Sequence, residues 1–220
     1  MVGLKHSTLV RQSETVMRIL FSAVAVALLL AVSPRQSVAQ LEVTPALGMY
    51  FPIGALISGN HANGGEVRRH IPAGSIGLRM AVWPAHRFGI EGSVVFSPSQ
   101  VAWEENGRVV DVNSGVFFAG VRGVFSLSPN TAVNTVRFGA GVGLVSRGGS
   151  AWTNTTGRTM PALNLAATAR FKLGRGPLAL LFQLEDYVGT AKLDSGSSLG
   201  TQARIHHDIL WTLGLAMRVR

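Results

Sequence analysis

The clearest pattern in the chain is the alternation of apolar and polar residues between Ala162 and Leu173. Every odd position of this stretch is apolar, whereas the even positions are small or polar and include Arg170 and Lys172. Successive side chains of a β-strand point to opposite faces, so strict alternation predicts a strand with one fully apolar face. We expect the other face to carry small side chains and the two cations.

The same alternation recurs along the chain and predicts eight strands. They cover residues 41–51, 74–83, 87–97, 114–126, 133–147, 162–173, 178–188 and 206–220. Short connections follow the second, fourth and sixth strands. Longer polar segments follow the first, third, fifth and seventh, and comprise residues 52–72, 98–113, 148–159 and 189–204. An up-and-down chain of this kind has all its long connections at one end, as transmembrane β-barrels do, and their strands also need about 9–11 residues.

Within the second long segment, Asn106-Gly107 is a signal for a short hairpin. Seven aromatic residues are candidates for the interface positions of a membrane barrel, namely Tyr50, Trp83, Phe96, Trp103, Trp152, Tyr187 and Trp211.

The composition of the polar face separates a membrane barrel from a soluble one. It carries only one or two charges per strand among Gly, Ala, Ser and Thr, whereas a soluble surface is about a quarter to a third charged. An eight-stranded barrel has a narrow interior that suits small side chains and a few long ones. Placing Arg137 or Arg170 against lipid would cost about 2–4 kcal/mol near the bilayer midplane. The sequence therefore predicts an all-β fold, an eight-stranded antiparallel up-and-down transmembrane β-barrel with its apolar face toward lipid.

The inward face of this barrel collects charges of both signs. It holds Glu42, Arg79, Glu91, Arg122, Arg137, Arg170, Lys172, Glu185 and Asp208, together with Arg218 near the end of the last strand. An unpaired buried charge is strongly destabilising, so we expect an ionic network that fills the lumen. A proton or solute path along the same side chains is the alternative. Alternate glycines at 139, 141 and 143 on this face would leave room for a bulky neighbour such as Trp83 or an arginine.

Residues 1–39 have the pattern of a secretory signal peptide. A basic start precedes a 14-residue apolar run at 19–32, and a small-x-small cleavage signal follows at 37–39. The apolar run is shorter than the roughly 20 residues that a membrane-spanning helix needs. We therefore expect cleavage after residue 39 and a single barrel domain over residues 40–220.

The charge of the remaining chain does not indicate a nucleic-acid partner. Residues 40–220 contain 16 Lys and Arg against 10 Asp and Glu. These cations are scattered singly, with Arg68-Arg69 the only adjacent pair, and a secreted chain does not meet nucleic acid. The chain has no cysteine, which excludes disulfides and thiolate metal sites. We expect no cofactor and no metal.

One polar cluster is a candidate for chemistry. His206 and His207 on the last strand lie beside Asp186 and Tyr187 on the strand before it. Histidines and carboxylates together could bind a metal or provide acid–base chemistry. A hydrogen-bonded polar rim is the simpler interpretation, and we assign no catalytic residue.

The signal peptide, the eight alternating strands and the loop asymmetry make the chain resemble the small outer-membrane β-barrel superfamily, which includes the transmembrane domain of outer-membrane protein A. The resemblance covers nearly all of residues 40–220. It implies a location in the outer membrane of a Gram-negative-type bacterium, contact with outer-membrane lipid, and assembly by the outer-membrane insertion machinery. Some eight-stranded relatives modify lipid A, and the deacylase type carries a His-x-Ser pair that this chain lacks after residue 39.

Three functions remain from the sequence. The first is a structural or surface-interaction role with the loops exposed outside, although the ligand of the loops is not indicated. The second is a narrow channel for small solutes or ions. The third is a lipid A-modifying enzyme that uses the cluster of His206 and His207.

Overall fold

A computed structural model describes residues 40–53, 57–59, 66–105, 108–153, 155–191 and 204–219. The signal peptide lies outside these residues and stays a prediction. The strands are β1 (Gln40–Ile53), β2 (Ile57–Gly59), β3 (Glu66–His70), β4 (Ala73–Trp83), β5 (Phe88–Glu105), β6 (Arg108–Ser126), β7 (Asn134–Gly148), β8 (Thr159–Lys172), β9 (Leu178–Ala191) and β10 (Arg204–Val219). A 3₁₀ turn, η1 (Ser150–Trp152), lies between β7 and β8. No helix in this part of the chain is long and apolar enough to cross a membrane.

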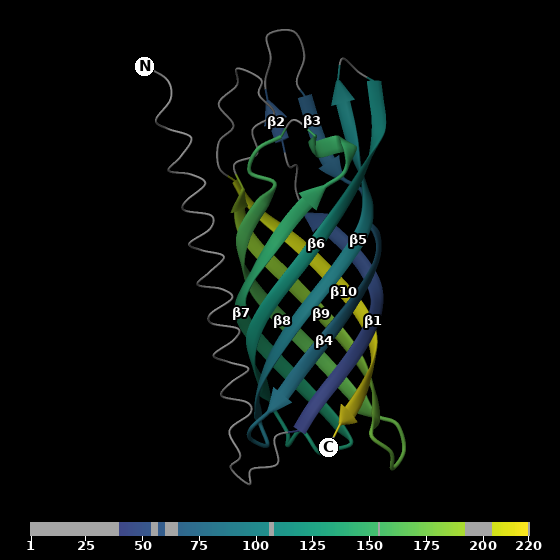
Figure 1. Cartoon of the computed structure of the whole chain (residues 1–220), viewed down its shortest axis with the longest axis vertical. Helices are drawn as coiled ribbons and strands as arrows, with labels where there is room; N and C mark the ends of the chain where they lie inside the picture. Colours follow the sequence, from purple (N-terminus) through teal and green to yellow (C-terminus); the bar gives the residue numbers. More distant parts are fainter. Residues whose placement is uncertain are drawn as a thin grey trace, which may run out of the picture. The chain divides into compact units, whose positions relative to one another are not determined.

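Eight of these strands close into an antiparallel barrel (Figure 1). Around the barrel the order is β1, β10, β9, β8, β7, β6, β5 and β4, and β4 pairs with β1 to close the ring. Along these eight strands each one therefore pairs with the next in the sequence, and the last, β10, pairs with the first, β1. The predicted up-and-down barrel is confirmed.

The two ends of the barrel differ. At one end, which we call the turn end, residues 84–87, 127–133 and 173–177 make short connections. At the other, the loop end, the chain continues beyond the barrel (Figure 1). The prediction of polar loops at 52–72 and 98–113 is wrong in part. The short strands β2 and β3 lie within the first segment, and β5 and β6 continue through the second.

Asn106-Gly107, about which a short hairpin was predicted, lie outside the described residues, and β5 and β6 form a hairpin that is paired up to Glu105 and Arg108 on either side of them. It is much longer than expected, since the pairing continues without a break from there to Phe88 and Phe125. The sequence concealed its length because the buried face of β5 continues with Ser97 and Ser99 before Val101, so apolar and polar residues do not alternate there.

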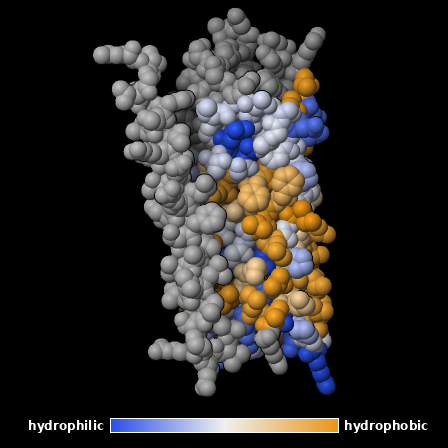
Figure 2. All heavy atoms as spheres, viewed as in Figure 1, coloured by the Kyte–Doolittle hydropathy of each residue, from blue (hydrophilic) through white to orange (hydrophobic). Residues whose placement is uncertain are grey.

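The barrel is polar inside and apolar outside. On β8, Asn164 and Arg170 are 0% and 2% exposed, whereas Leu163 and Leu165 are 49% and 40% exposed. Figure 2 shows the consequence, an apolar band over the wall of the barrel with polar residues gathered near the loop end. Large apolar side chains exposed in a continuous band mark a surface that contacts lipid. The predicted orientation of the two faces is confirmed.

Candidate functional site

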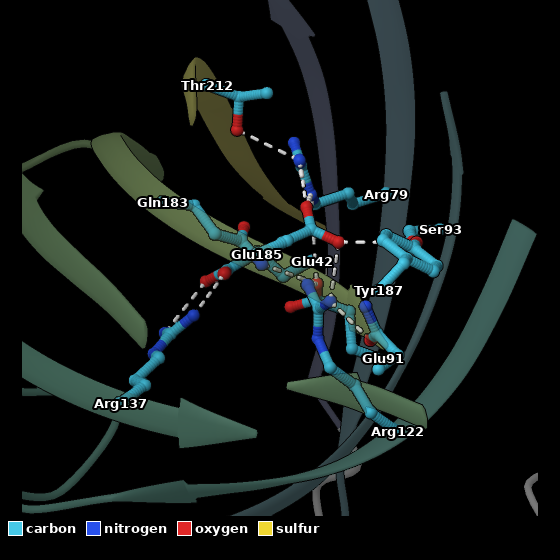
Figure 3. Close-up of polar contacts among 11 residues, drawn as sticks. Glu42, Arg79, Glu91, Ser93, Arg122, Arg137, Gln183, Glu185, Tyr187 and Thr212 are labelled. Carbon is cyan, nitrogen blue, oxygen red and sulfur yellow. Dashed lines mark hydrogen bonds and ion pairs between the residues drawn. The ribbon is translucent and has the colours of Figure 1, made fainter. Parts of the chain in front are cut away.

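Four charged side chains cross the centre of the lumen and form the central cluster (Figure 3). They are Arg79 on β4, Glu91 on β5, Arg122 on β6 and Glu185 on β9. The wholly buried Glu185 accepts hydrogen bonds from Arg79 Nε at 3.0 Å and from Arg122 Nη1 at 2.7 Å. Glu91 pairs with Arg122 Nη2, and its Oε1 lies 4.0 Å from Arg79 Nε. Two cations and two carboxylates make the central cluster neutral.

Neutral polar groups extend the central cluster to two further strands. Arg79 Nη2 donates to the Thr212 hydroxyl of β10 at 2.9 Å. Arg122 Nη1 donates to Asn164 Oδ1 of β8 at 2.8 Å. Six of the eight barrel strands thus contribute to one hydrogen-bonded layer. These hydrogen bonds hold the layer together across the lumen, although the amide nitrogen of Asn164 has no hydrogen-bond partner in the described part of the chain.

A second group of charges, the turn-end cluster, surrounds Glu42 near the turn end. Glu42 Oε1 accepts from Arg137 Nη1 at 2.7 Å, and its Oε2 lies 3.4 Å from Arg170 Nε and 3.7 Å from Arg218 Nη2. The guanidinium carbon of Arg137 also lies 4.3 Å from the ring centroid of Trp83, a cation–π contact. Three guanidinium groups share one carboxylate, so this end of the lumen is positively charged.

A third group, the loop-end cluster, is built on Asp208. Its carboxylate accepts from the Tyr50 hydroxyl at 2.6 Å and from Arg147 Nη2 at 2.6 Å. Arg147 was missed by the sequence analysis, although it has the same parity on its strand as Arg137 and so faces the same way.

Two aromatic rings lie close to the loop-end cluster. The ring of His70 is 5.8 Å from that of Tyr50 and 5.5 Å from that of Trp152, the last residue of η1. The Trp152 indole N–H donates to the Ser114 hydroxyl at 2.9 Å, which fixes the fully buried ring. Burial lowers the pKa of His70, on β3 outside the eight spanning strands, to about 3, and the positive charge of Arg147 adds to this effect. His70 is therefore neutral in the folded protein at neutral pH.

The alternate glycines of β7 leave space for two of these side chains. A Cβ atom at Gly139 would lie 2.8 Å from Cδ of Arg122, and one at Gly143 would lie 2.8 Å from the ring of Tyr187. Real Cβ atoms do not approach so closely, so glycine at these positions admits the arginine and the tyrosine into the lumen.

Of the charged residues predicted to face the lumen, Lys172 alone belongs to none of the three clusters. It is half-buried at the end of β8, and it takes part in no ion pair with any residue whose side chain the structure describes. All the others belong to one of the three clusters defined above.

The histidine cluster predicted on β9 and β10 is divided between the two faces of the barrel wall. Tyr187 and His206 are buried inside, whereas Asp186 and His207 lie on the outer face. His207 Nδ1 lies 2.8 Å from Asp186 Oδ2, and their side chains are 44% and 28% exposed. Alternation imposes this division, because adjacent residues of a strand point to opposite sides.

The proposed set of interface aromatics is wrong for four of its members. Tyr50, Trp83, Trp152 and Tyr187 are buried, at 0% or 1% exposed, and they fill the interior. Phe96 and Trp211 lie on the outer face. The side chain of Trp103 falls outside the described residues. For the aromatic residues on strands, the alternation of side chains decides whether a ring points into the lumen or to the outer face. Closeness to a strand end does not decide it.

The structure offers little for metal chemistry where it is described. In those residues, no three His, Cys, Asp or Glu side chains lie close enough together to hold a metal ion. His207 and Asp186 form a histidine–carboxylate contact there, and this pair lies on the outer face.

Comparison with known proteins identifies the fold. The sequence matches no protein-family model and no curated protein. The structure is similar to the outer membrane protein OprG of Pseudomonas aeruginosa, with a TM-score of 0.63 and 10% identity over 83% of this chain and 96% of that one. It is also similar to outer membrane protein AlkL in lipid bilayers (TM-score 0.52, 14% identity, 83% and 90% covered) and to Neisserial surface protein A (0.50, 8%, 81% and 96%). The chain therefore has the fold of the small eight-stranded outer-membrane β-barrels.

Proposed function

We propose that this chain is an outer-membrane protein with a non-conducting lumen, whose role is to present structure at the cell surface. The observation that carries the proposal is the central cluster. Side chains from six strands meet there in one layer, and its charges are buried and balanced.

A solute or ion passing along the lumen would have to separate these pairs. Breaking a buried ion pair costs about 3–5 kcal/mol, because the remaining charge is left without compensation in a low-dielectric site. The interior of an eight-stranded barrel is also only wide enough for its own side chains. A closed lumen therefore fits this chain better than a channel.

The location follows from the fold and the apolar outer face. A barrel with an apolar belt requires lipid around it, so lipid of the outer membrane is its constant neighbour. We include assembly by the outer-membrane insertion machinery in the proposal, and we assign no nucleic-acid partner. The loop end would face the outside of the cell.

Planar lipid bilayers test the closed lumen. The purified full chain should give no conductance steps under conditions in which a large general porin, added to the same bilayer as a control, conducts. Stepwise conductance that grows with the amount of the chain would overturn the proposal in favour of a narrow channel.

A second candidate, a lipid A-modifying enzyme, is favoured by the outer pair of His207 and Asp186. A histidine oriented by a carboxylate is half of a nucleophile-activating arrangement, and this pair lies on the outer face of the barrel wall. Among the residues with described side chains, no serine or threonine hydroxyl is hydrogen-bonded to His207. Mass spectrometry of lipid A tests the candidate. A modification that requires the chain and disappears in His207→Ala would support it, and identical lipid A with and without the chain would exclude it.

A further inference from the structure

Strand β6 extends further beyond the barrel than its neighbour β7. Residues 108–126 of β6 pair with β5, whereas the pairing with β7 begins only at Gly115, opposite Gly148. In the described part of the chain, no strand pairs with residues 108–114 on the side away from β5, and the turn before β8 contacts Asn113 and Ser114. Residues 108–112 are therefore a free sheet edge at the loop end, and we call them the β6 edge (Figure 1).

The register shows which backbone groups the β6 edge presents. In an antiparallel ladder, successive residues direct their N–H and C=O groups to alternate sides. Odd residues of β6 direct them toward the β7 side, since a Cβ at Gly143 of β7 would lie 2.7 Å from the carbonyl oxygen of Ala119. The carbonyl of Asn113 points the same way and accepts from the Ser150 hydroxyl at 3.2 Å. The ladder with β5 has no bulge, so this alternation continues unchanged to the start of β6. The backbone N–H and C=O groups of Val109 and Asp111 therefore also point away from β5, to the free side.

The side chains along the β6 edge favour strand pairing. Val109 and Val110 are 65% and 58% exposed, and Asp111 is exposed as well. β-Branched residues are the best strand formers. Proteins usually protect such an edge with proline, charged side chains or a bulge. Residues 108–112 contain no proline, lysine or bulge, and their charged residues are Arg108 and Asp111. An exposed, regular edge of this composition is a template for another strand.

We propose that the β6 edge binds an extended segment of another protein, which adds to the sheet as a further strand. This inference rests on the surface role proposed above and names the kind of partner. Strand addition uses main-chain hydrogen bonds for affinity and alternate side chains for specificity. A basic residue would lie opposite Asp111, and apolar residues would lie on the other face, beside Val110 and Val112. The segment should therefore alternate between basic and apolar residues.

A second copy of the chain is not the occupant. Two copies inserted in one membrane share the direction of β6 along the membrane normal, and strands of such barrels tilt by about 35–45°. When two such barrels stand side by side with their β6 edges facing each other, the two strands tilt in opposite directions. The strands then cross, so their backbone groups cannot form hydrogen bonds over several successive residues. A flexible extended segment has no such restriction.

Fluorescence anisotropy tests the proposal on the refolded full chain in lipid nanodiscs. The probe is a labelled ten-residue peptide of alternating valine and lysine. Its control is the same peptide with methyl groups on alternate backbone nitrogens, which removes the donors of one edge and keeps every side chain. Val109→Pro removes a donor that points to the free side and should leave the ladder with β5 intact. Val109→Thr is the matched variant that keeps this N–H.

The proposal expects the unmethylated peptide to bind wild type and Val109→Thr, and expects binding to weaken about tenfold with the methylated peptide or with Val109→Pro. Asp111→Lys should reverse the preference, so that a valine–glutamate peptide binds better than the valine–lysine one. Equal binding of the methylated and unmethylated peptides, or no binding of either, would overturn it. The bilayer conductance of the chain does not depend on the β6 edge, so failure here would leave the closed lumen standing.

Discussion

Replacing Glu185 by glutamine should destabilise the protein strongly, because this side chain balances two arginines at once. Glu185 is wholly buried and contacts both Arg79 and Arg122. Without its charge, Glu91 alone would compensate two guanidinium groups, and its Oε1 lies as far as 4.0 Å from Arg79 Nε. Breaking a buried pair costs about 3–5 kcal/mol, and the glutamine oxygen can retain one hydrogen bond worth about 1 kcal/mol. We therefore expect a loss of about 2–4 kcal/mol in the free energy of unfolding.

Urea unfolding of the full chain in lipid vesicles measures this loss, provided that the dependence on urea keeps the slope of the wild type. Asp186→Asn is the matched control. It makes the same chemical change at the next residue of β9, but on the outer face, where the pair with His207 is partly exposed. An exposed ion pair contributes about 0–1 kcal/mol, so the control should stay within that range.

A double variant tests the cause. Adding Arg122→Gln to Glu185→Gln leaves Arg79 with Glu91 and restores the charge balance, so it should recover about 1 kcal/mol or more through coupling of neighbouring sites. The reasoning would be refuted if Glu185→Gln behaved like Asp186→Asn, or if the double variant lost the sum of the two single losses.

Three further predictions concern other parts of the barrel. Gly143→Ala should lower the free energy of unfolding by about 1–3 kcal/mol through overpacking, whereas Gly148→Ala, where a Cβ meets nothing within 4 Å, should be near neutral in the same urea assay. Because the pKa of His70 is lowered to about 3 and that of an unfolded histidine is about 6.5, the unfolded chain binds the extra proton between these values. Stability should therefore fall by about 2 kcal/mol from pH 6.5 to pH 5, and His70→Phe should remove that component from unfolding curves recorded at the two pH values. In variants that retain a single tryptophan, brominated lipid chains should quench Trp211, which is 43% exposed, and leave the buried Trp83 bright; equal quenching would contradict the assignment of faces.

Alternation predicted the barrel well because a strand between lipid and a packed polar lumen has two unlike faces. The period of two located all eight strands and placed Asn164 and Arg170 inside. The same rule contained the signal for Arg147, which shares the parity of Arg137. It also separates Trp83, inside, from Trp211, outside.

The rest depended on features that alternation does not contain. Glu42 and Arg137 are 95 residues apart, and they meet because the tilt and register of the strands bring β1 and β7 together across the lumen. The long β5–β6 hairpin was hidden for a different reason, since buried Ser97 and Ser99 of β5 interrupt the alternation of apolar and polar residues. Trp152 enters the interior from a connection, where periodicity has no meaning.

Cysteine labelling in intact cells tests most directly the proposal that the loop end of this barrel faces the outside. The natural sequence has no cysteine, so single cysteines can be placed at Val109, at the loop end, and at Gly176, at the turn end, where a Cβ meets nothing within 4 Å. A membrane-impermeant maleimide should label Val109→Cys in intact cells and should label Gly176→Cys only after the cells are broken. Labelling of Gly176→Cys alone in intact cells, or of neither variant until lysis, would contradict the account.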